Sequence, residues 1–214
     1  MQKANNLKNM RLNYEQGQLL ESNIEMNPFE LFRKWFDQAV EAKIIEPNAM
    51  TIATATKEGI PSARVVLLKG FDETGFVFYT NYHSRKGKEL NDNPFAAILF
   101  WWREFERQIR IEGKIEKISR KESEEYFNQR PLKSRYGTLA SEQSEIIENR
   151  EVLEKRFADL EKQYGANPPT PENWGGYKLI PAKFEFWQGR TSRLHDRICY
   201  HKENNNWKIF RLQP

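Results

Sequence analysis

The chain has 214 residues, of which 38% are hydrophobic and 30% charged, as in a globular protein with one sizeable core. Its single cysteine, Cys199, excludes an internal disulfide and any multi-cysteine metal site. The formal net charge of +4 is modest, no apolar run reaches membrane-spanning length, and the N-terminus lacks the apolar core of a signal peptide, so we expect a cytoplasmic protein with no membrane or nucleic-acid partner.

The N-terminal segment is expected to be an arm outside the core. Residues 1–26 are polar with little periodicity, which predicts a flexible arm, and within it Arg11 and Tyr14 could cover a site elsewhere in the protein. Residues 27–214 are expected to form a single domain. Its first helix is predicted to start at Asn27, because a capping residue followed by proline is typical of a helix N-terminus.

Strands are predicted after this helix. A first strand is expected over residues 50–56, and the apolar run 65–68 predicts a second strand that is buried on both faces. The turn residues that follow, and the alternating segment 76–80, predict the antiparallel partner of that second strand. Arg64 and Lys69 would then place cations at both ends of the buried run.

A short basic helix is predicted after this hairpin. Ser84 is a suitable N-cap, yet the first turn carries Arg85 and Lys86, whose charge has the wrong sign for the positive end of a helix. A bound anion would remove this conflict, because free backbone N–H groups, a hydroxyl and two cations suit a phosphate monoester. A solvated basic turn is the alternative at this point.

Further strands and a second phosphate site are predicted in the middle of the chain. Residues 96–102 and 109–115 have the apolar and alternating patterns of strands. A capping box then opens a helix on which Tyr126 and Arg130 share one face, and Ser134 lies just beyond it. These three side chains could hold a second phosphate, and a surface tyrosine–arginine pair is the alternative.

The last part of the chain is predicted to contain one long helix and several strands. The helix is expected over residues 144–164, with an apolar stripe that begins at Ile146, and a proline-rich loop follows it. Strands are then predicted over residues 177–180, 183–187, 193–201 and 207–212. Strands in runs, with separate helices and no βαβ alternation, predict a mainly β fold with flanking helices (α+β), built on an antiparallel sheet or barrel.

One histidine lies between two arginines near the C-terminus. If this segment is extended, Arg193, His195 and Arg197 lie on one face of a strand, where three potential cations need a counter-charge. Glu185 and Asp196 could supply it as a purely structural arrangement. His195 is nevertheless the best candidate in the chain for proton transfer near neutral pH.

The sequence lacks the short motifs of several enzyme classes. It contains no His-Glu-x-x-His, no paired-cysteine zinc spacing, no Gly-x-Gly-x-x-Gly, no Walker loop and no Gly-x-Ser-x-Gly elbow. Their absence disfavours metal catalysis, dinucleotide binding on a Rossmann unit and hydrolysis by a serine on a nucleophile elbow. Two candidate phosphate sites, many aromatic residues and a histidine between two arginines suit an enzyme with a phosphorylated organic cofactor, which these patterns alone do not identify.

Several stretches, in order along the chain, give a more specific indication. They are Arg64-Val-Val-Leu-Leu-Lys69, Phe78-Tyr-Thr-Asn81, Ser84-Arg-Lys-Gly87, Glu106-Arg-Gln-Ile-Arg110, Tyr126-Phe-Asn-Gln-Arg-Pro131, Ser141-Glu-Gln-Ser144, Trp174-Gly-Gly-Tyr177, Glu185-Phe-Trp-Gln-Gly189 and Arg193-Leu-His-Asp-Arg197. In these stretches the chain resembles the pyridoxine/pyridoxamine 5'-phosphate oxidases. The resemblance implies a split β-barrel homodimer with FMN bound in two clefts at the subunit interface, and no metal.

The resemblance also implies residue roles. The FMN contacts would be Arg64, Val65, Val66, Leu67, Leu68, Lys69, Tyr79, Thr80, Arg85, Lys86, Gln108, Gln143, Ser144, Trp187 and Arg197. The substrate contacts would be Arg11, Tyr14, Lys69, Tyr126, Arg130, Ser134, Arg193 and His195, of which Arg193 and His195 would be the catalytic residues.

The activity that the resemblance implies is the oxidation of pyridoxamine 5'-phosphate and pyridoxine 5'-phosphate to pyridoxal 5'-phosphate. The substrate C4' would give a hydride to FMN, and dioxygen would reoxidise the flavin and yield hydrogen peroxide. The segment after Ser134 departs from the family form at Arg135, Tyr136, Thr138 and Leu139, which form part of the expected pocket wall.

Three other functions stay open. The first is a flavin enzyme of the same barrel that reduces a different substrate with a nicotinamide or deazaflavin donor. The second is a carrier or sensor that binds pyridoxal phosphate or flavin without catalysis. The third is a nucleic-acid-binding barrel that uses its aromatic residues and positive charge.

Overall fold

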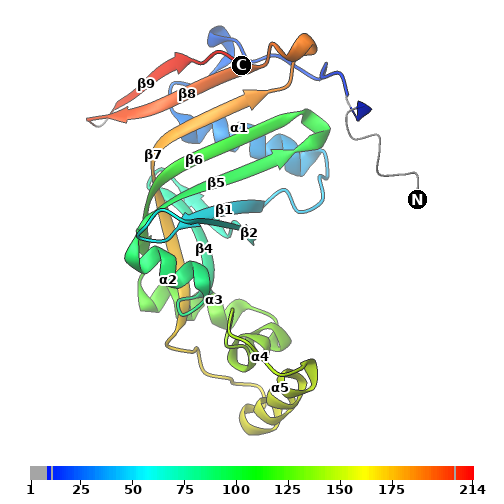
Figure 1. Ribbon diagram of the computed structural model, residues 1–214, viewed down its shortest axis with the longest axis vertical. Coiled ribbons are helices and arrows are strands. Elements are labelled where there is room, and N and C mark those ends of the chain that lie inside the picture. The colour runs from blue at the N-terminus through cyan, green and yellow to red at the C-terminus, as the bar shows by residue number, and fades with distance from the viewer. Residues whose placement is uncertain (1–8, 11, 205) are drawn as a thin grey trace. The chain divides into compact units, whose positions relative to one another are not determined.

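The computed structural model describes residues 9, 10, 12–204 and 206–214 (Figure 1). Arg11, which we expected to cover a site, lies outside the described residues. The helices are α1 (Pro28–Glu41), α2 (Arg85–Asp92), α3 (Arg120–Gln129), α4 (Leu132–Ala140) and α5 (Arg150–Tyr164), with short 3-10 turns η2 (Glu21–Asn23), η3 (Arg103–Phe105) and η4 (Thr191–Arg193). None of the described helices has the length and apolar character needed to cross a membrane.

The described strands form one sheet. They are β1 (Ala49–Ala55), β2 (Pro61–Leu67), β3 (Gly70–Asp72), β4 (Gly75–Asn81), β5 (Phe95–Trp102), β6 (Arg107–Lys117), β7 (Trp174–Gln188), β8 (Asp196–Glu203) and β9 (Asn206–Arg211). Their hydrogen-bonded order is β2-β1-β5-β6-β7-β4-β3, with β8 beside β7 and β9 beside β8. The pairs β1–β2, β3–β4, β4–β7, β7–β8 and β8–β9 are antiparallel, so the predicted antiparallel β fold with flanking helices is confirmed.

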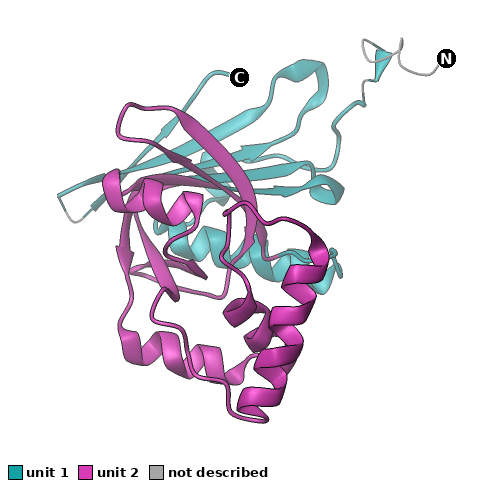
Figure 2. Ribbon diagram, turned by 60° about the horizontal axis from the view of Figure 1, so that its bottom comes forward, with its two compact units in different colours: residues 1–47, 99–111, 183–214 teal, residues 48–98, 112–182 magenta. Residues whose placement is uncertain are grey.

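The chain divides into two compact units (Figure 2). Unit 1 contains residues 1–47, 99–111 and 183–214, and unit 2 contains residues 48–98 and 112–182. Strands β5, β6 and β7 contribute residues to both units. Because the segments interleave, each unit depends on contacts between residues far apart in the sequence.

The core of unit 1 is aromatic and lies under α1. This helix begins where the sequence predicts it, because the Asn27 Oδ1 atom accepts a hydrogen bond from the backbone N–H of Phe29 at 3.0 Å. Phe32 packs on Phe100 with ring centroids 5.2 Å apart, and Trp35 packs edge-on against Phe186 at 5.3 Å. The apolar face of α1 therefore covers β5 and β7 within this unit.

The first hairpin of unit 2 differs from the predicted pairing. β2 pairs with β1, with Arg64 opposite Ile52, whereas β4 pairs with β3 and β7. The chain reverses directly after β1 at Gly59, whose φ of +86° is a backbone conformation that glycine adopts more readily than other residues. The predicted partnership of residues 65–68 with residues 76–80 is therefore wrong.

The burial of β2 also differs from the prediction. Its residues are exposed or half-buried, and Val65 has 67% of its surface exposed. The apolar run indicated a strand buried on both faces, but Val65, Val66 and Leu67 line a pocket instead of the core. Leu68, which follows the strand, is buried with 5% exposure.

The predicted starts of α2 and α3 in unit 2 are confirmed, but the predicted common helix face of Tyr126 and Arg130 is not. The Ser84 hydroxyl caps α2 by accepting from the backbone N–H of Gly87 at 3.3 Å, and the predicted capping box opens α3. Arg130 lies beyond α3 with an extended backbone, so it does not share a helix face with Tyr126. The cause is Pro131, because a residue before proline avoids the helical region.

Three predicted boundaries shift in the C-terminal part. Ser134 lies in α4, a helix that the sequence patterns did not indicate. α5 starts at Arg150 because Asn149 caps it, and Ile146 is fully exposed outside the helix. The two strands predicted around Pro181 are one continuous β7, and β8 starts at Asp196 because η4 precedes it.

Candidate functional site

A pocket of about 700 Å³ lies in unit 2 between β2, β4, α3 and α4. Residues predicted for the site that line it are Arg64, Val65, Val66, Leu67, Lys69, Tyr79, Thr80, Lys86, Tyr126, Arg130, Ser134 and Gln143. The lining also contains Thr138, which was expected only as part of the pocket wall. The remaining lining residues, which the sequence interpretation did not assign to the site, are Asn81, Pro131, Gly137, Ser141 and Trp174. The two predicted phosphate sites thus share one pocket.

A buried lysine marks one part of this pocket. Lys86 is 7% exposed, and its Nζ atom donates to the side-chain oxygens of Thr80, Gln143 and Ser84 at 3.1, 3.2 and 3.4 Å. Among the described residues it forms no ion pair. Burial, with the nearby charge of Arg64, lowers the pKa of Lys86 to about 8 against a smaller opposing effect of Glu89. A buried ammonium with neutral partners suits an anionic ligand.

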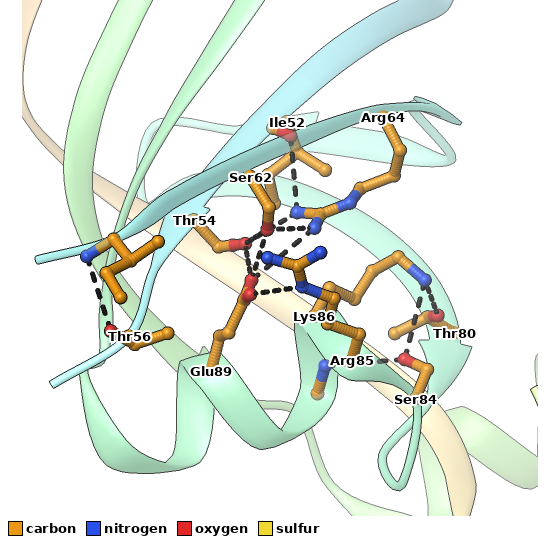
Figure 3. Close-up of polar contacts among 12 residues, drawn as sticks. Ile52, Thr54, Thr56, Ser62, Arg64, Thr80, Ser84, Arg85, Lys86 and Glu89 are labelled. Atoms are coloured by element: carbon orange, nitrogen blue, oxygen red, sulfur yellow. Dashed lines mark hydrogen bonds and ion pairs between the residues drawn. The ribbon is translucent and has the colours of Figure 1, made fainter. Parts of the chain in front are cut away.

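A buried carboxylate organises the cations beside Lys86 (Figure 3). Glu89, on α2, forms ion pairs with Arg64 at 3.4 Å and with Arg85 at 2.9 Å. Although burial raises the pKa of Glu89, hydrogen bonds from Ser62, Thr54 and Arg85 and the charge of Arg64 lower it to about 2. Glu89 is therefore ionised at neutral pH.

Six of the predicted cofactor residues lie outside the pocket lining, namely Leu68, Arg85, Gln108, Ser144, Trp187 and Arg197. Arg85 has 60% of its side chain exposed and turns to Glu89, and together with Ser144 it lines a separate hollow of about 420 Å³. The expectation that Arg85 and Lys86 point to one anion came from their adjacency. Neighbouring helix residues point about 100° apart, so only Lys86 lines the main pocket.

An aromatic wall forms the opposite part of the pocket. Tyr79 stacks on Tyr126 with ring centroids 4.0 Å apart and on Trp174 at 5.4 Å. The Arg130 guanidinium lies 4.9 Å from the Trp174 ring centroid and donates to the Thr138 hydroxyl at 2.7 Å. Burial, with the nearby Tyr126, raises the pKa of Tyr79 to about 12, so this phenol stays neutral at physiological pH.

Trp174 is the most informative residue that the sequence interpretation missed, and Thr138 was expected in the pocket wall without a role of its own. The Trp174 position was recognisable only as part of a Trp-Gly-Gly-Tyr motif, without a role for the indole. Thr138 is one of the departures from the family form, and it now accepts from Arg130 in the pocket wall. Among the other departures, Tyr136 is buried and donates to the backbone carbonyl of Gly165.

A second cluster of predicted residues lies in unit 1. The rings of Trp187 and His195 have centroids 4.6 Å apart, and Tyr14 contacts both with centroids at 5.8 Å. The His195 Nδ1 atom accepts a hydrogen bond from the backbone N–H of Arg190 at 3.1 Å, so the neutral ring carries its proton on Nε2. Burial and then the charge of Arg193 lower the pKa of His195, which favours this neutral form.

Arg193 does not follow the predicted strand geometry. It lies in η4, is exposed, and has a φ of +63°, while the preceding Ser192 has a φ of +55°. The expectation that Arg193 shares a strand face with His195 and Arg197 is wrong, because the strand begins only at Asp196. Two successive non-glycine residues in the left-handed region store strain, which is a feature of functional sites.

The structural counter-charge expected for Arg197 is confirmed. The two carboxylate oxygens of Glu185, which is 3% exposed, accept from the Nε and Nη2 atoms of Arg197, both at 3.0 Å. Arg110 donates to the same carboxylate at 2.6 Å. This pairing fixes the plane of the Arg197 guanidinium. Gln108 lies half-buried on β6 in the same unit.

A mostly antiparallel sheet with flanking helices and a basic pocket defines the class of this chain as a split-barrel protein. PhzG from Burkholderia lata 383, solved in complex with tetrahydrophenazine-1-carboxylic acid, matches with a TM-score of 0.88 and 33% identity over 94% of this chain and 100% of that chain. A pyridoxamine 5'-phosphate oxidase-related, FMN-binding protein from Nostoc punctiforme PCC 73102 has the same fold, with a TM-score of 0.68 and 18% identity over 86% of this chain and 97% of that chain.

Sequence comparison defines the family. Residues 36–171 match the model of pyridoxamine 5'-phosphate oxidase, and residues 174–214 match that of the pyridoxine 5'-phosphate oxidase C-terminal dimerisation region. The curated pyridoxine/pyridoxamine 5'-phosphate oxidase of Paraburkholderia phytofirmans is 55% identical over 210 residues, which are 97% of this chain and 99% of that protein. The one of Paraburkholderia phymatum is 56% identical over 209 residues, with the same coverage. The chain belongs to the pyridoxamine 5'-phosphate oxidase family.

Family membership confirms the resemblance found in the sequence motifs. It supports an oxidoreductase with a flavin cofactor, since the matching family model and the curated relatives are those of pyridoxamine 5'-phosphate oxidases. The match to the dimerisation region supports a homodimer. The pocket fits such a cofactor in one specific respect, because the buried Lys86 ammonium lacks an anionic partner among the described side chains.

Proposed function

We propose that this protein is an FMN-dependent pyridoxal 5'-phosphate synthase that acts as a homodimer. Pyridoxamine 5'-phosphate, dioxygen and water would yield pyridoxal 5'-phosphate, ammonia and hydrogen peroxide, and pyridoxine 5'-phosphate and dioxygen would yield the same aldehyde and peroxide. The observation that carries the proposal is a single pocket with two cationic regions, one at Lys86 and one at Arg130, where the guanidinium lies against the aromatic wall. Relatives 55% identical over nearly their whole length and named for this activity support it.

The chain's own residues provide the cofactor contacts in this proposal. When bound, FMN would supply the two-electron acceptor for the reaction. Lys86 and Arg64 would hold its phosphate, and Thr80 and Gln143 would orient Lys86 by accepting its N–H groups. The remaining predicted contacts would be Val65, Val66, Leu67, Leu68, Lys69, Tyr79, Arg85 and Ser144, with Gln108, Trp187 and Arg197 completing the site in the homodimer.

The second cationic region would hold the phosphate of the substrate. Arg130 is half-buried against Trp174, and this partial burial lowers its pKa without removing its charge at neutral pH. Lys69, Tyr126 and Ser134 line the same pocket and would supply further hydrogen bonds. Anchoring by the phosphate fixes the position of the substrate C4' atom, which is the main way in which such a site lowers the activation barrier.

His195 and Arg193 would act on the pyridine ring of the substrate, with Arg11 and Tyr14 covering it. The His195 Nδ1 atom already accepts the Arg190 N–H group, so the Nε2 proton is the one available to the substrate. His195 would therefore donate a hydrogen bond in its neutral form. Arg193 would supply the positive charge next to it.

The proposed activity is tested by oxygen consumption and peroxide release with pyridoxamine 5'-phosphate and pyridoxine 5'-phosphate. We expect turnover of both, and none with the unphosphorylated vitamers, because phosphate anchoring positions C4'. A related function is oxidation of a reduced phenazine acid, favoured by the similarity to PhzG. Turnover of tetrahydrophenazine-1-carboxylic acid without turnover of either vitamer phosphate would replace the proposal, and a purified protein that retains RNA but no flavin would reject it.

The affinity for FMN is expected to depend on pH through Lys86. Its pKa falls from the ordinary 10.5 to about 8 in the folded protein, so the charge that binds phosphate is lost above pH 8 in the apoprotein. By linkage, the unliganded fold gains stability between pH 8 and 10.5, because the unfolded chain binds the extra proton there. Dissociation constants measured by flavin fluorescence from about pH 6.5 to about pH 10 should therefore rise above about pH 8.

A matched variant separates this effect from alkaline unfolding. Arginine does not titrate in this range, so Lys86→Arg should bind FMN with no such increase of the dissociation constant near pH 8, whatever its affinity at pH 7. If the wild-type protein and this variant lose affinity at the same pH, Lys86 is not the group that titrates.

A further inference from the structure

Glu89 has an unusual position for an acidic residue next to a proposed phosphate site. Its carboxylate is 5% exposed and lies on α2, one turn after Arg85. The Oε2 atom accepts from the hydroxyl of Ser62 at 2.6 Å and from the hydroxyl of Thr54, and the Oε1 atom accepts from the Arg85 Nε–H at 2.9 Å (Figure 3). Burying a charge is costly unless it is paired and hydrogen-bonded, and every oxygen here is satisfied.

The same two hydroxyls also hold Arg64. Its Nη1 atom donates to the Thr54 hydroxyl at 2.5 Å, and its Nη2 atom donates to the Ser62 hydroxyl and, at 3.4 Å, to Glu89. Each hydroxyl therefore donates a hydrogen bond to the carboxylate and accepts one from the guanidinium. Thr54 and Ser62 bridge an anion and a cation that lie on different elements, α2 and β2.

The charge of this cluster fits a phosphate monoester. Arg85, which lies outside the pocket lining, offsets the negative charge of Glu89. The two positive charges on the pocket lining are then those of Arg64 and Lys86. A phosphate monoester carries close to two negative charges at neutral pH. Without Glu89, Arg64 would be free to leave the pocket wall, because mutual repulsion of the cations would no longer be opposed.

We propose that Glu89 is a positioning residue that acts through Arg64, by way of the Thr54 and Ser62 hydroxyls, and gives the site its selectivity for a phosphorylated flavin over an unphosphorylated one. This inference rests on the proposed FMN function and deepens it. The carboxylate does not touch the ligand; it holds the guanidinium that does.

The test measures the dissociation constants of FMN and riboflavin for the apoprotein by quenching of flavin fluorescence. Glu89→Gln keeps the shape of the side chain but removes its charge, and should weaken FMN binding about tenfold, the effect typical of a lost charge-assisted hydrogen bond. Riboflavin binding should change less than about twofold, since it lacks the phosphate. Asp92→Asn removes an exposed carboxylate from the same helix and should change neither constant.

A double-mutant cycle tests whether Glu89 acts through Arg64. Arg64→Gln should weaken FMN binding, and Glu89→Gln added to it should weaken binding no further, because the residue through which Glu89 acts is already gone. Additive effects would overturn the proposal. Should Glu89→Gln fail to fold, Thr54→Val removes one hydroxyl bridge at nearly constant volume and should produce part of the same selective loss, whereas unchanged FMN binding in Thr54→Val would count against it.

Three outcomes identify which statement fails. Tighter binding of FMN by Glu89→Gln would mean that Glu89 only repels the anion, and would overturn the inference. An equal loss of FMN and riboflavin binding, together with a lower Tm, would mean that Glu89 is merely structural, and would also overturn it. A wild-type protein with no preference for FMN over riboflavin would instead reject the proposed function on which the inference rests.

Discussion

Replacement of Lys86 by methionine is expected to weaken FMN binding to the apoprotein about 100-fold, which corresponds to about 2.7 kcal/mol, within the range for hydrogen bonds to charged groups. The reason is burial, because Lys86 is 7% exposed and its Nζ atom meets only neutral oxygens of the described residues. An anion that binds there meets an ammonium group that burial has already stripped of most of its water, so binding requires little further desolvation of Lys86. Riboflavin binding should stay within about threefold of the wild-type value.

The same substitution should raise the stability of the apoprotein. Burial lowers the pKa of Lys86 to about 8, so at pH 7 the fold carries the cost of keeping a desolvated ammonium charged. Methionine has a similar length and no charge, so Lys86→Met should increase the apoprotein Tm while it lowers the FMN-dependent rise in Tm. Both are measured by thermal unfolding with and without FMN.

A control on the same helix distinguishes local from general electrostatics. Lys88 is 62% exposed and pairs with Glu145 at 2.7 Å, so its charge is screened by water. Lys88→Met should alter the affinity for FMN less than about threefold. Equal losses in Lys86→Met and Lys88→Met would show that net charge, and not the buried ammonium, attracts the ligand.

Local signals in the sequence predicted the helix starts well. Asn27, Ser84 and the capping box at Ser119 each have a side-chain oxygen in the right place to accept a backbone N–H, and each begins a helix in the structure. Such signals act over three or four residues, so no tertiary information is needed. Asn149 is a cap of the same kind, and it was missed because Ser144 offered an earlier start.

Strand pairing could not be predicted in the same way. The run at residues 65–68 is apolar, and apolar runs indicate burial, but only Leu68 is buried. The side chains of residues 65–67 line a pocket whose other walls come from residues far along the chain. The turn at Gly59 makes β1 the partner of β2. The sequence contains several other segments that are equally typical of turns, so the pattern alone did not identify this one as the hairpin turn of β2. Pairing is a choice among alternatives that differ only in tertiary packing.

The candidate site shows the same division. The cations at Lys86 and Arg130 were identified from the sequence because charges at a helix start and beside a proline break are local features, whereas Arg64 was placed beside them through a hairpin that does not form. The bridging role of Thr54 and Ser62 was not predicted, since neither hydroxyl belongs to a motif. The wrong strand face around Arg193 has a similar origin, because alternation was assumed across a turn with left-handed residues.

Replacement of Arg193 by alanine is expected to lower kcat/KM for pyridoxamine 5'-phosphate about 100-fold and to leave the affinity for FMN unchanged. Arg193 is exposed in η4 with a φ of +63°, a strained conformation that costs about 1–3 kcal/mol and persists only where the surroundings enforce it. A strained backbone that keeps the Arg193 guanidinium exposed suits a residue that contacts a ligand. Steady-state kinetics and flavin titration of the same preparation measure the two effects.

The variant should also change the titration of His195. The charge of Arg193 lowers the pKa of His195, so its removal should raise that pKa and extend the protonated form to higher pH. Arg193→Lys keeps the charge but not the planar fork, so it should preserve the His195 titration measured by NMR while kcat/KM stays low. If Arg193→Ala turned over the substrate like the wild type, Arg193 would have no role in positioning the ring. If Arg193→Lys restored full turnover, the charge alone would be the functional property of Arg193.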